Sequence, residues 1–280
     1  MIYRSPEGNY SSATSESDQR SRAEKPVLIL ALGRGRVGKT VFLNAVAQFY
    51  REAGATLEIW NIDQHNVTDS LNNFFPDVRS PESTGDHDTL QWLEDRIANQ
   101  SRNRYDAILD VGGNDTKIRK LAEDVKLDRL LERRGIRPVA VHVLGPDAAD
   151  LDYLRQVSVD NIFMPDATLL VFNLGLVGNR SLNGAFNRIA ADPLVLEAVA
   201  RGAKVIRMPE LACMRGVLDR HLTFRAVADD ERTEFVLDPL SFFDQERVAI
   251  WWDDKMRDFF GKLPATWMPR IPAGDGDGSD

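Results

Sequence analysis

The chain has 280 residues, of which 43% are hydrophobic and 28% are charged, and its formal net charge is −8. These values are typical of a globular protein with a sizeable core, and they exclude a protein that coats nucleic acid through its overall charge. The single cysteine, Cys213, excludes an internal disulfide and favours a reducing compartment, so we expect a cytoplasmic protein.

The two ends of the chain differ in composition from the rest. Residues 1–24 are polar and rich in serine, without the apolar core of a secretory signal, and residues 273–280 are mostly glycine and aspartate. We expect both tails to be disordered and residues 25–272 to form a single domain. No apolar run approaches the ~18 residues that a membrane span needs.

Short aliphatic runs alternate with longer amphipathic stretches along this domain. The predicted strands are residues 27–32, 56–62, 107–111, 139–144, 168–173 and 204–208. They are almost purely apolar, as expected of parallel strands that are covered on both faces. The predicted helices are residues 39–53, 89–100, 117–134, 148–157 and 185–201, with a closing helix at 241–263. This alternation predicts an α/β protein with a doubly wound, mostly parallel sheet and helices on both faces.

The segment after the first predicted strand has the composition of a phosphate-binding loop. Its sequence, GRGRVGKT, matches the pattern G-x-x-x-x-G-K-[ST]. Glycines let backbone N–H groups turn toward a phosphate, Lys39 supplies a positive charge, and the Thr40 hydroxyl can bind Mg²⁺. The helix that follows directs the positive end of its dipole at the anion. The motif therefore predicts the fold of a P-loop NTPase. The expected nucleotide-binding residues of this segment are Gly33, Gly35, Arg36, Val37, Gly38, Lys39, Thr40 and Val41.

A nucleoside triphosphatase also needs carboxylates near its metal and its attacking water. Asp63 ends the stretch LEIWNID and Asp110 ends YDAILD, so both follow predicted strands. The carboxyl ends of parallel strands face one crevice, which should bring both aspartates near the loop. Asp110 also begins a D-x-x-G pattern that ends at Gly113, whose N–H can approach a γ-phosphate. We expect Thr40, Asp63 and Asp110 to be the metal ligands, although either aspartate alone could be a helix cap or a turn residue.

In combination these residues resemble the ParA/MinD-type ATPases, the branch of P-loop proteins with a deviant Walker A motif. That family has D-x-D-P-Q-x-N after its second strand, a later strand that ends in an adenine-reading asparagine, and another that runs into Ile-Pro. The corresponding segments here are NIDQHNVT, which lacks the proline and the first acid, LLVFN ending at Asn173, and VIRMPEL with Pro209. The resemblance extends over about residues 26–218.

The resemblance implies an ATP- and Mg²⁺-dependent switch that forms a homodimer on ATP binding and is reset by slow hydrolysis. A protein activator or adaptor would stimulate this ATPase activity. In such a protein Asp63 would orient the water, and Asp110 would sense the metal and the γ-phosphate. Asn173 and Pro209 would hold the adenine. The biological uses that the resemblance suggests are DNA or plasmid partitioning, conjugative transfer and the positioning of a cellular assembly.

Two arginines of the loop stand where the family has other residues. Arg34 aligns with the signature lysine, which reaches the partner subunit's nucleotide, so we expect Arg34 to act across the dimer. Together with Lys39 and Asp63 it makes up the expected catalytic set. Arg36 replaces a glycine, so it must accept the backbone angles of the loop while its side chain leaves the pocket. Two roles then remain for the Arg36 side chain. It could point to solvent or pair with an acid, without a function in binding, or it could act at the dimer face or on a partner.

Two further stretches bear on partners. The stretch from Lys117 to Arg137 is basic and could face DNA, but a solvated amphipathic helix is favoured. The closing helix mixes acidic and basic residues on its polar side, which favours packing on the core over contact with a membrane. Its expected inward residues are Trp252, Met256, Phe259 and Leu263.

Two alternatives to the switch remain open on sequence grounds. The loop and the second acidic motif both depart from the family pattern, which also fits a scaffold that binds ATP without hydrolysing it. A metabolic ATP-dependent ligase or synthetase on the same fold is the other alternative, and it would need a second substrate pocket with polar residues of its own.

Overall fold

The computed structural model describes residues 25–63, 70–113, 116–160, 162–178, 181, 184–231 and 240–272. The expectations for the two tails, and for residues 64–68 of the motif after the second strand, lie outside the described residues.

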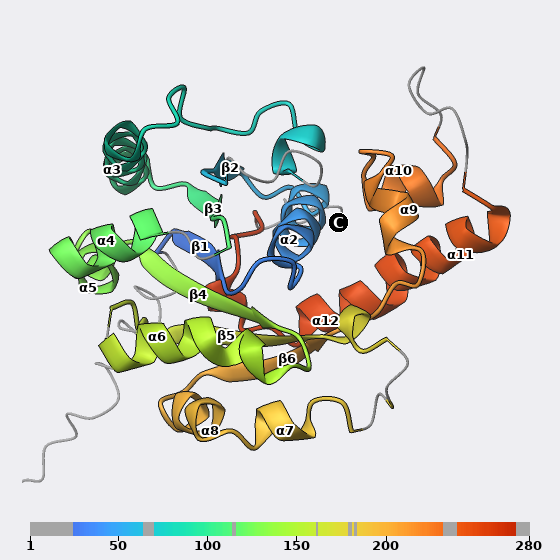
Figure 1. Ribbon diagram of the computed structural model, residues 1–280. Coiled ribbons are helices and arrows are strands. Elements are labelled where there is room, and N and C mark those ends of the chain that lie inside the picture. Colours follow the sequence, from blue (N-terminus) through green and yellow to red (C-terminus); the bar gives the residue numbers. More distant parts are fainter. Residues whose placement is uncertain are drawn as a thin grey trace, which may run out of the picture.

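A six-stranded sheet with only parallel strand pairs forms the centre of the molecule (Figure 1). The order across the sheet is β2-β3-β1-β4-β5-β6. All the predicted strands are confirmed, with ends that differ by no more than two residues. The strands are β1 (Val27–Leu32), β2 (Leu57–Asn61), β3 (Asp106–Asp110), β4 (Arg137–Leu144), β5 (Ala167–Asn173) and β6 (Lys204–Met208).

Helices cover both faces of this sheet (Figure 1), which confirms the doubly wound α/β fold. The α-helices are α2 (Lys39–Glu52), α3 (Asp86–Asn103), α4 (Thr116–Val125), α5 (Leu127–Arg133), α6 (Asp152–Asp160), α7 (Asn187–Ala190), α8 (Pro193–Ala200), α9 (Met214–Leu218), α10 (Phe224–Ala228), α11 (Phe242–Ile250) and α12 (Arg257–Gly261). Short 3₁₀ turns are η1 (Leu71–Asn73), η2 (Ala148–Leu151), η3 (Leu174–Leu176) and η5 (Ala265–Trp267), and η4 (Trp251–Met256) is a π-helical segment.

The core follows from the alternation of side chains along each strand. In β1, Val27, Ile29 and Ala31 join a cluster with α2 and the helices from α9 to α12. The intervening leucines of the same strand pack against α3, α4, α5 and α6, while the last part of the sheet packs on α7 and α8. Because the strands from β1 to β5 bury both of their faces, they read as continuous apolar runs in the sequence.

Two predicted helices are corrected by the structure. The helix expected at 117–134 is broken into α4 and α5, because Lys126 takes a left-handed conformation at φ 51° and ends the first helix. The helix expected at 185–201 is also two helices. Pro193 is the first residue of α8, and the Asp192 side chain accepts a hydrogen bond from the N–H of Leu194 at 3.0 Å. Asp192 therefore caps a new helix at this point.

The chain from Phe242 to Gly261 runs as one continuous closing helix that contains the π segment η4. The wider turn of η4 lets the consecutive residues Trp251 and Trp252 both face the core. The expected inward residues of this helix are all buried, which confirms packing on the protein's own core: Trp252, Met256, Phe259 and Leu263. None of the described helices combines the length and the apolar character that crossing a bilayer would need.

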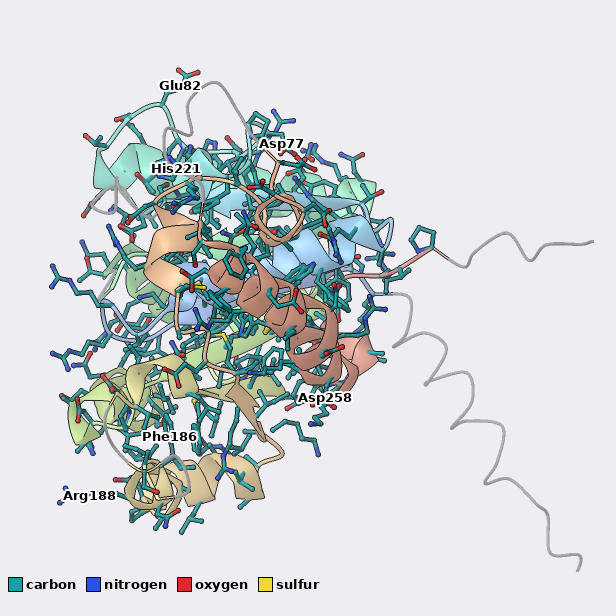
Figure 2. The ribbon with its side chains drawn as sticks, turned by 90° about the vertical axis from the view of Figure 1, so that its right-hand side faces the viewer. Asp77, Glu82, Phe186, Arg188, His221 and Asp258 are labelled. Carbon is teal, nitrogen blue, oxygen red and sulfur yellow. The ribbon has the colours of Figure 1, made fainter. Side chains whose placement is uncertain are left out.

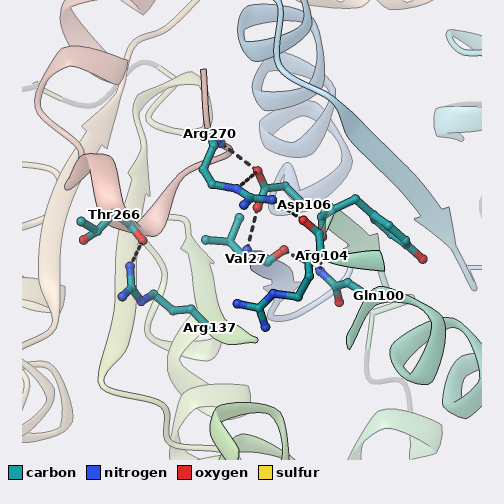
Figure 3. A network of polar contacts seen from close by, with 8 residues as sticks. Val27, Gln100, Arg104, Asp106, Arg137, Thr266 and Arg270 are labelled. Atoms are coloured by element: carbon teal, nitrogen blue, oxygen red, sulfur yellow. Dashed lines mark hydrogen bonds and ion pairs between the residues drawn. The ribbon is translucent and has the colours of Figure 1, made fainter. Parts of the chain in front are cut away.

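A polar network ties the end of the described chain to the amino ends of the strands (Figure 3). The buried Asp106 carboxylate at the start of β3 accepts hydrogen bonds from the N–H of Val27, at 2.8 Å, and from the N–H and Nε of Arg270, at 2.8 and 3.0 Å. Nearby, Arg137 at the start of β4 donates to the Thr266 carbonyl. The segment after the closing helix is therefore fixed under three central strands.

We predict that Asp106→Ala lowers the free energy of unfolding by about 2–4 kcal/mol, because it removes the acceptor of the buried Val27 N–H and of the partly buried N–H of Arg270. Urea denaturation measures this loss. Asp77→Ala removes an exposed aspartate that pairs with Arg51, and we expect it to cost under about 1 kcal/mol. Equal effects of the two substitutions would contradict the role of the network.

Candidate functional site

The segment between β1 and α2, here called the phosphate-binding loop (residues 33–40), turns back on itself through residues with positive φ. Gly33 has φ 134° and Gly38 has φ 97°, values that suit glycine. Arg36 has φ 65° and its side chain is exposed. Arg36 thus accepts the backbone angles of the loop, in a conformation that is unfavourable for arginine. Its exposed side chain still contributes to the lining of the cavity beside the loop, so it does not leave the pocket entirely.

Lys39, the first residue of α2, is buried and lies across this loop. Its Nζ donates to the carbonyl of Arg34 at 3.0 Å and to that of Gly33 at 3.2 Å. Burial lowers the pKa of Lys39, while the negative charges of Asp110 and Asp63 act in the opposite direction. The loop thus places one ammonium group next to two carboxylates, at the amino end of a helix.

Asp110 ends β3 inside the protein, 1% exposed. Burial raises the pKa of Asp110 to about 7, and a hydrogen bond from the Thr40 side chain and the charge of Lys39 oppose that rise. Its Oδ1 is buried and has no hydrogen-bond partner among the described residues. A buried carboxylate oxygen without a partner is costly unless a donor or a cation satisfies it.

Asp63 follows β2, and the last residue of that strand, Asn61, fixes its backbone. The Asn61 side chain accepts from the N–H of Asp63 at 2.9 Å and donates to Ser70 Oγ at 2.9 Å. Asn61 stands where the family pattern has its first acid, and its amide here anchors the backbone of Asp63. A methyl group added to Gly112 would lie 3.2 Å from Asp63 Oδ1, so the segment after Asp110 packs directly against this carboxylate.

Gly113 contacts the phosphate-binding loop itself. A Cβ on Gly113 would lie 2.5 Å from the backbone nitrogen of Gly35 and 2.6 Å from its Cα, distances that no side chain can accommodate. The D-x-x-G pattern recognised in the sequence thus brings Gly113 to the loop. The close approach explains the glycine at this position.

Asn173, at the end of β5, braces the loop from the other side. Its Nδ2 donates to the Val37 carbonyl at 2.9 Å, and its Oδ1 accepts from the N–H of Gly175 at 3.0 Å. A Cβ on Gly38 would lie 2.5 Å from Asn173 Nδ2. These contacts give Asn173 a structural role that the sequence did not indicate. Its contact with adenine stays a prediction.

A cavity of about 900 Å³ opens beside the loop and is lined by Gly35, Arg36, Gly38, Lys39, Thr40, Val41, Asp63, Gly113, Asn173 and Pro209. Ten of the fourteen residues that the sequence nominated thus line one cavity, whereas Gly33, Arg34, Val37 and Asp110 are not part of its lining. The structure adds a mostly apolar wall from the segments after β5 and β6: Leu176, Met208, Leu211, Met214, Arg215 and Leu218. Only the family resemblance pointed to this region, through Pro209. Trp251 Nε1 donates to the Pro209 carbonyl at 3.0 Å and fixes this wall to the closing helix.

Arg34 lies outside this lining and pairs with an acid that sequence reasoning missed. Its Nη1 is 3.5 Å from Oδ1 of Asp150, whose side chain is buried in the turn after β4. Burial raises the pKa of Asp150, and the charge of Arg34 opposes the rise. Asp150 is one of several aspartates in the stretch PDAADLD, so the sequence offered no signal that would single it out.

The donor set of the cavity fits a Mg²⁺-bound phosphate better than a metal held by protein alone. The part of the chain that the structure describes contains no group of three or more His, Cys, Asp or Glu side chains that could hold a metal. Mg²⁺ is commonly held by one or two carboxylates together with phosphate and water oxygens. Asp110, with an oxygen lacking a partner, and the hydroxyl of Thr40 beside it match that arrangement.

The basic stretch from Lys117 to Arg137 is partly paired with acids of the protein. Lys117 and Lys120 lie 3.8 and 3.5 Å from the carboxylate of Asp86, and Arg119 pairs with Glu123 at 2.9 Å. Arg137 is buried under the sheet. Ion pairs thus hold at least three of the eight basic residues of this stretch.

No family model matches the chain, and no curated protein matches it. Among solved structures it is similar to the MinD cell division protein of Aquifex aeolicus, with 14% identity and a TM-score of 0.43 over 85% of this chain and 98% of that one. It is also similar to chloroplast FtsY from Physcomitrella patens, with 14% identity and a TM-score of 0.42 over 62% of this chain and 55% of that one.

A third similar structure is the signal recognition particle receptor FtsY from Elizabethkingia anophelis, with 15% identity and a TM-score of 0.44 over 82% of this chain and 66% of that one. The chain thus spans between about half and two thirds of the two FtsY chains. Likenesses this remote do not determine the activity of the chain.

We predict that Gly38→Ala lowers the free energy of unfolding by about 1–3 kcal/mol, because alanine is strained at φ 97° and its methyl group would meet the Asn173 amide. Gly35→Ala is the matched control, since a Cβ there meets nothing within 4 Å, and we expect it to change stability by under about 0.5 kcal/mol. Chemical denaturation of both variants measures the difference. An equal loss in both would show that the backbone of the loop is not constrained in this way.

Proposed function

We propose that this protein is an ATP-dependent switch that binds Mg²⁺–ATP at the phosphate-binding loop and hydrolyses it slowly. The observation that carries the proposal is that Lys39 and Thr40 line one cavity at the amino end of α2. Behind them Asp110 is buried, bonded to the Thr40 side chain, with one oxygen that has no partner among the described residues. A helix amino end, a loop rich in glycine and a lysine together suit a polyphosphate.

The roles of the residues follow from their places around the cavity. Backbone N–H groups of the loop and the Lys39 ammonium would bind the phosphates, and Thr40 and Asp110 would hold Mg²⁺. When bound, Mg²⁺ would neutralise negative charge that develops on the phosphate oxygens. Asp63, fixed by Asn61 beside Gly112, would orient the attacking water. The apolar wall around Met208, Pro209 and Leu211 would take the base, and the family resemblance makes adenine the proposed base.

Homodimerisation on ATP belongs to the same proposal. Arg34 supports it, since the side chain is about half exposed near the phosphate-binding loop and is held by a single acid. Asp150 would compete with the partner subunit's nucleotide for this guanidinium. A protein activator and a use in partitioning, transfer or positioning remain predictions of the family resemblance. DNA binding remains a prediction from the basic stretch, in which at least three of the eight basic residues pair with acids of the chain.

A scaffold that binds ATP without hydrolysis is the alternative, and turnover separates the two. Under the proposal, phosphate release from ATP is measurable and Asp63→Ala abolishes it while ATP still binds. Tight ATP binding with no phosphate release from the wild-type protein would favour the scaffold.

For the binding itself, we predict Mg²⁺-dependent, saturable binding of a fluorescent ATP analogue, stronger than that of the matching GTP analogue. Lys39→Ala should weaken it roughly tenfold or more, as the loss of a charge-assisted hydrogen bond implies. Lys126→Ala, an exposed lysine on the α4–α5 connection, serves as control and should bind as the wild type does. The absence of saturable binding of either analogue would refute the proposal, and equal binding of both would refute the adenine preference.

We further predict that substitutions at the two ends of the Arg34–Asp150 pair have opposite effects on dimerisation. With a non-hydrolysable ATP analogue, Arg34→Ala should keep the protein monomeric in light-scattering measurements, since the contact across the dimer is lost. Asp150→Asn should shift dimerisation to lower protein concentration, because it releases Arg34. Dimerisation that is unchanged in both variants would show that Arg34 has no role across the dimer.

A further inference from the structure

The two edges of the sheet differ in whether another segment of the described chain pairs with them. Along β2, the backbone of Arg79 donates to the Ile59 carbonyl at 2.8 Å and accepts from the N–H of Asn61 at 2.9 Å, so this edge is covered. At the other edge, β6 pairs only with β5 among the described residues. In a parallel ladder, alternate residues of an edge strand direct their N–H and C=O groups away from the sheet. Strand β6 therefore presents a row of backbone groups that a second strand could use.

Strand β6 is also more exposed than the sequence led us to expect. Its apolar run predicted a strand covered on both faces, but Lys204, Val205 and Arg207 are exposed, and Val205 keeps 44% of its surface accessible. The correction has a simple cause: among the described residues β6 pairs with β5 alone, so one side of this strand has no neighbouring strand.

A groove of about 700 Å³ runs between β6 and the end of the closing helix, and we call it the β6 groove. It is lined by Lys204, Val205, Ile206, Arg207, Pro209, Lys255, Asp258, Phe259, Lys262, Leu263 and Pro264. Phe259 and Leu263 are buried and form an apolar floor. Figure 2 shows Asp258 on the outer surface of the closing helix, where it pairs with Lys262.

The charge of the β6 groove is opposite to that of the whole protein. Four basic side chains line it and Asp258 is its only acid, although the chain as a whole has a net charge of −8. Lys204, Arg207 and Lys255 make no ion pair within the described part of the chain. A local basic groove on a protein of negative net charge favours acidic segments at that place, because their charge is complementary to the groove.

We propose that the β6 groove is a docking site for an extended, acidic segment of a partner protein, which adds to the sheet as a strand beside β6. Backbone groups of the segment pair with the free edge of β6, acidic side chains meet Lys204, Arg207 and Lys255, and apolar side chains that alternate with them cover Val205 or the floor. The tail at 273–280 is acidic, but besides its aspartates it has only glycine, alanine and serine, so it offers no large apolar side chains for the floor.

The experiment uses the full chain without nucleotide, so its outcome does not depend on the proposed ATPase. A fluorescein-labelled peptide of alternating glutamate and valine should bind, by fluorescence anisotropy, roughly tenfold or more tightly than a peptide of alternating lysine and valine. Added salt should weaken the binding. Methylation of the backbone nitrogens in the central half of the acidic peptide should abolish the binding, since a strand that cannot donate hydrogen bonds cannot extend the sheet.

Charge reversal locates the site. Lys204→Glu together with Arg207→Glu should weaken binding of the acidic peptide roughly tenfold or more, whereas Arg129→Glu with Arg133→Glu, the same charge change on α5, should leave it unchanged. Circular dichroism establishes that both double variants are folded. The proposal would be overturned if the acidic and basic peptides bind equally, or if charge reversal at Lys204 and Arg207 does not change the binding. The basic residues of β6 would then serve only to protect the sheet edge against pairing with other strands. Retained binding of the methylated peptide would overturn strand addition.

Discussion

The site depends on the burial of one carboxylate, that of Asp110, beside the lysine that begins α2. Removal from water raises the pKa of Asp110 and lowers that of Lys39, and each group partly restores the charged form of the other. The remaining elements fix this pair in place. Asn173 braces the phosphate-binding loop, Gly113 packs against it, and Asn61 anchors the segment that carries Asp63.

The fold was predictable from the sequence because the physical signals were local. Continuous apolar runs marked the strands, and the pattern from Gly33 to Thr40 placed the loop between a strand and a helix. Since all strands are parallel, their carboxyl ends had to meet, and that constraint alone brought Asp63 and Asp110 to the loop. Most of the candidate residues therefore lie around one cavity, while their contacts with ATP and Mg²⁺ remain proposals.

The features that the sequence did not predict depend on contacts between segments that lie far apart in the chain. Asp150 pairs with Arg34 across more than a hundred positions, and nothing distinguishes it from its neighbouring aspartates. The apolar wall of the cavity combines the chain after β5 with that after β6, so no window of sequence contains it. The break at Lys126 and the exposure of β6 likewise depend on what packs nearby, and neither propensity nor hydrophobicity encodes that.

One titration decides whether the Asp110 oxygen that lacks a partner among the described residues belongs to a Mg²⁺ site for a bound nucleotide. Calorimetry of ATP binding with and without Mg²⁺ would be compared between the wild-type protein and Asp110→Asn, which keeps the size of the side chain but removes its charge. We expect Mg²⁺ to strengthen ATP binding by the wild type, and Asp110→Asn to lose this increment while still binding ATP. An increment of equal size in both proteins would show that Asp110 does not bind the Mg²⁺ of the nucleotide.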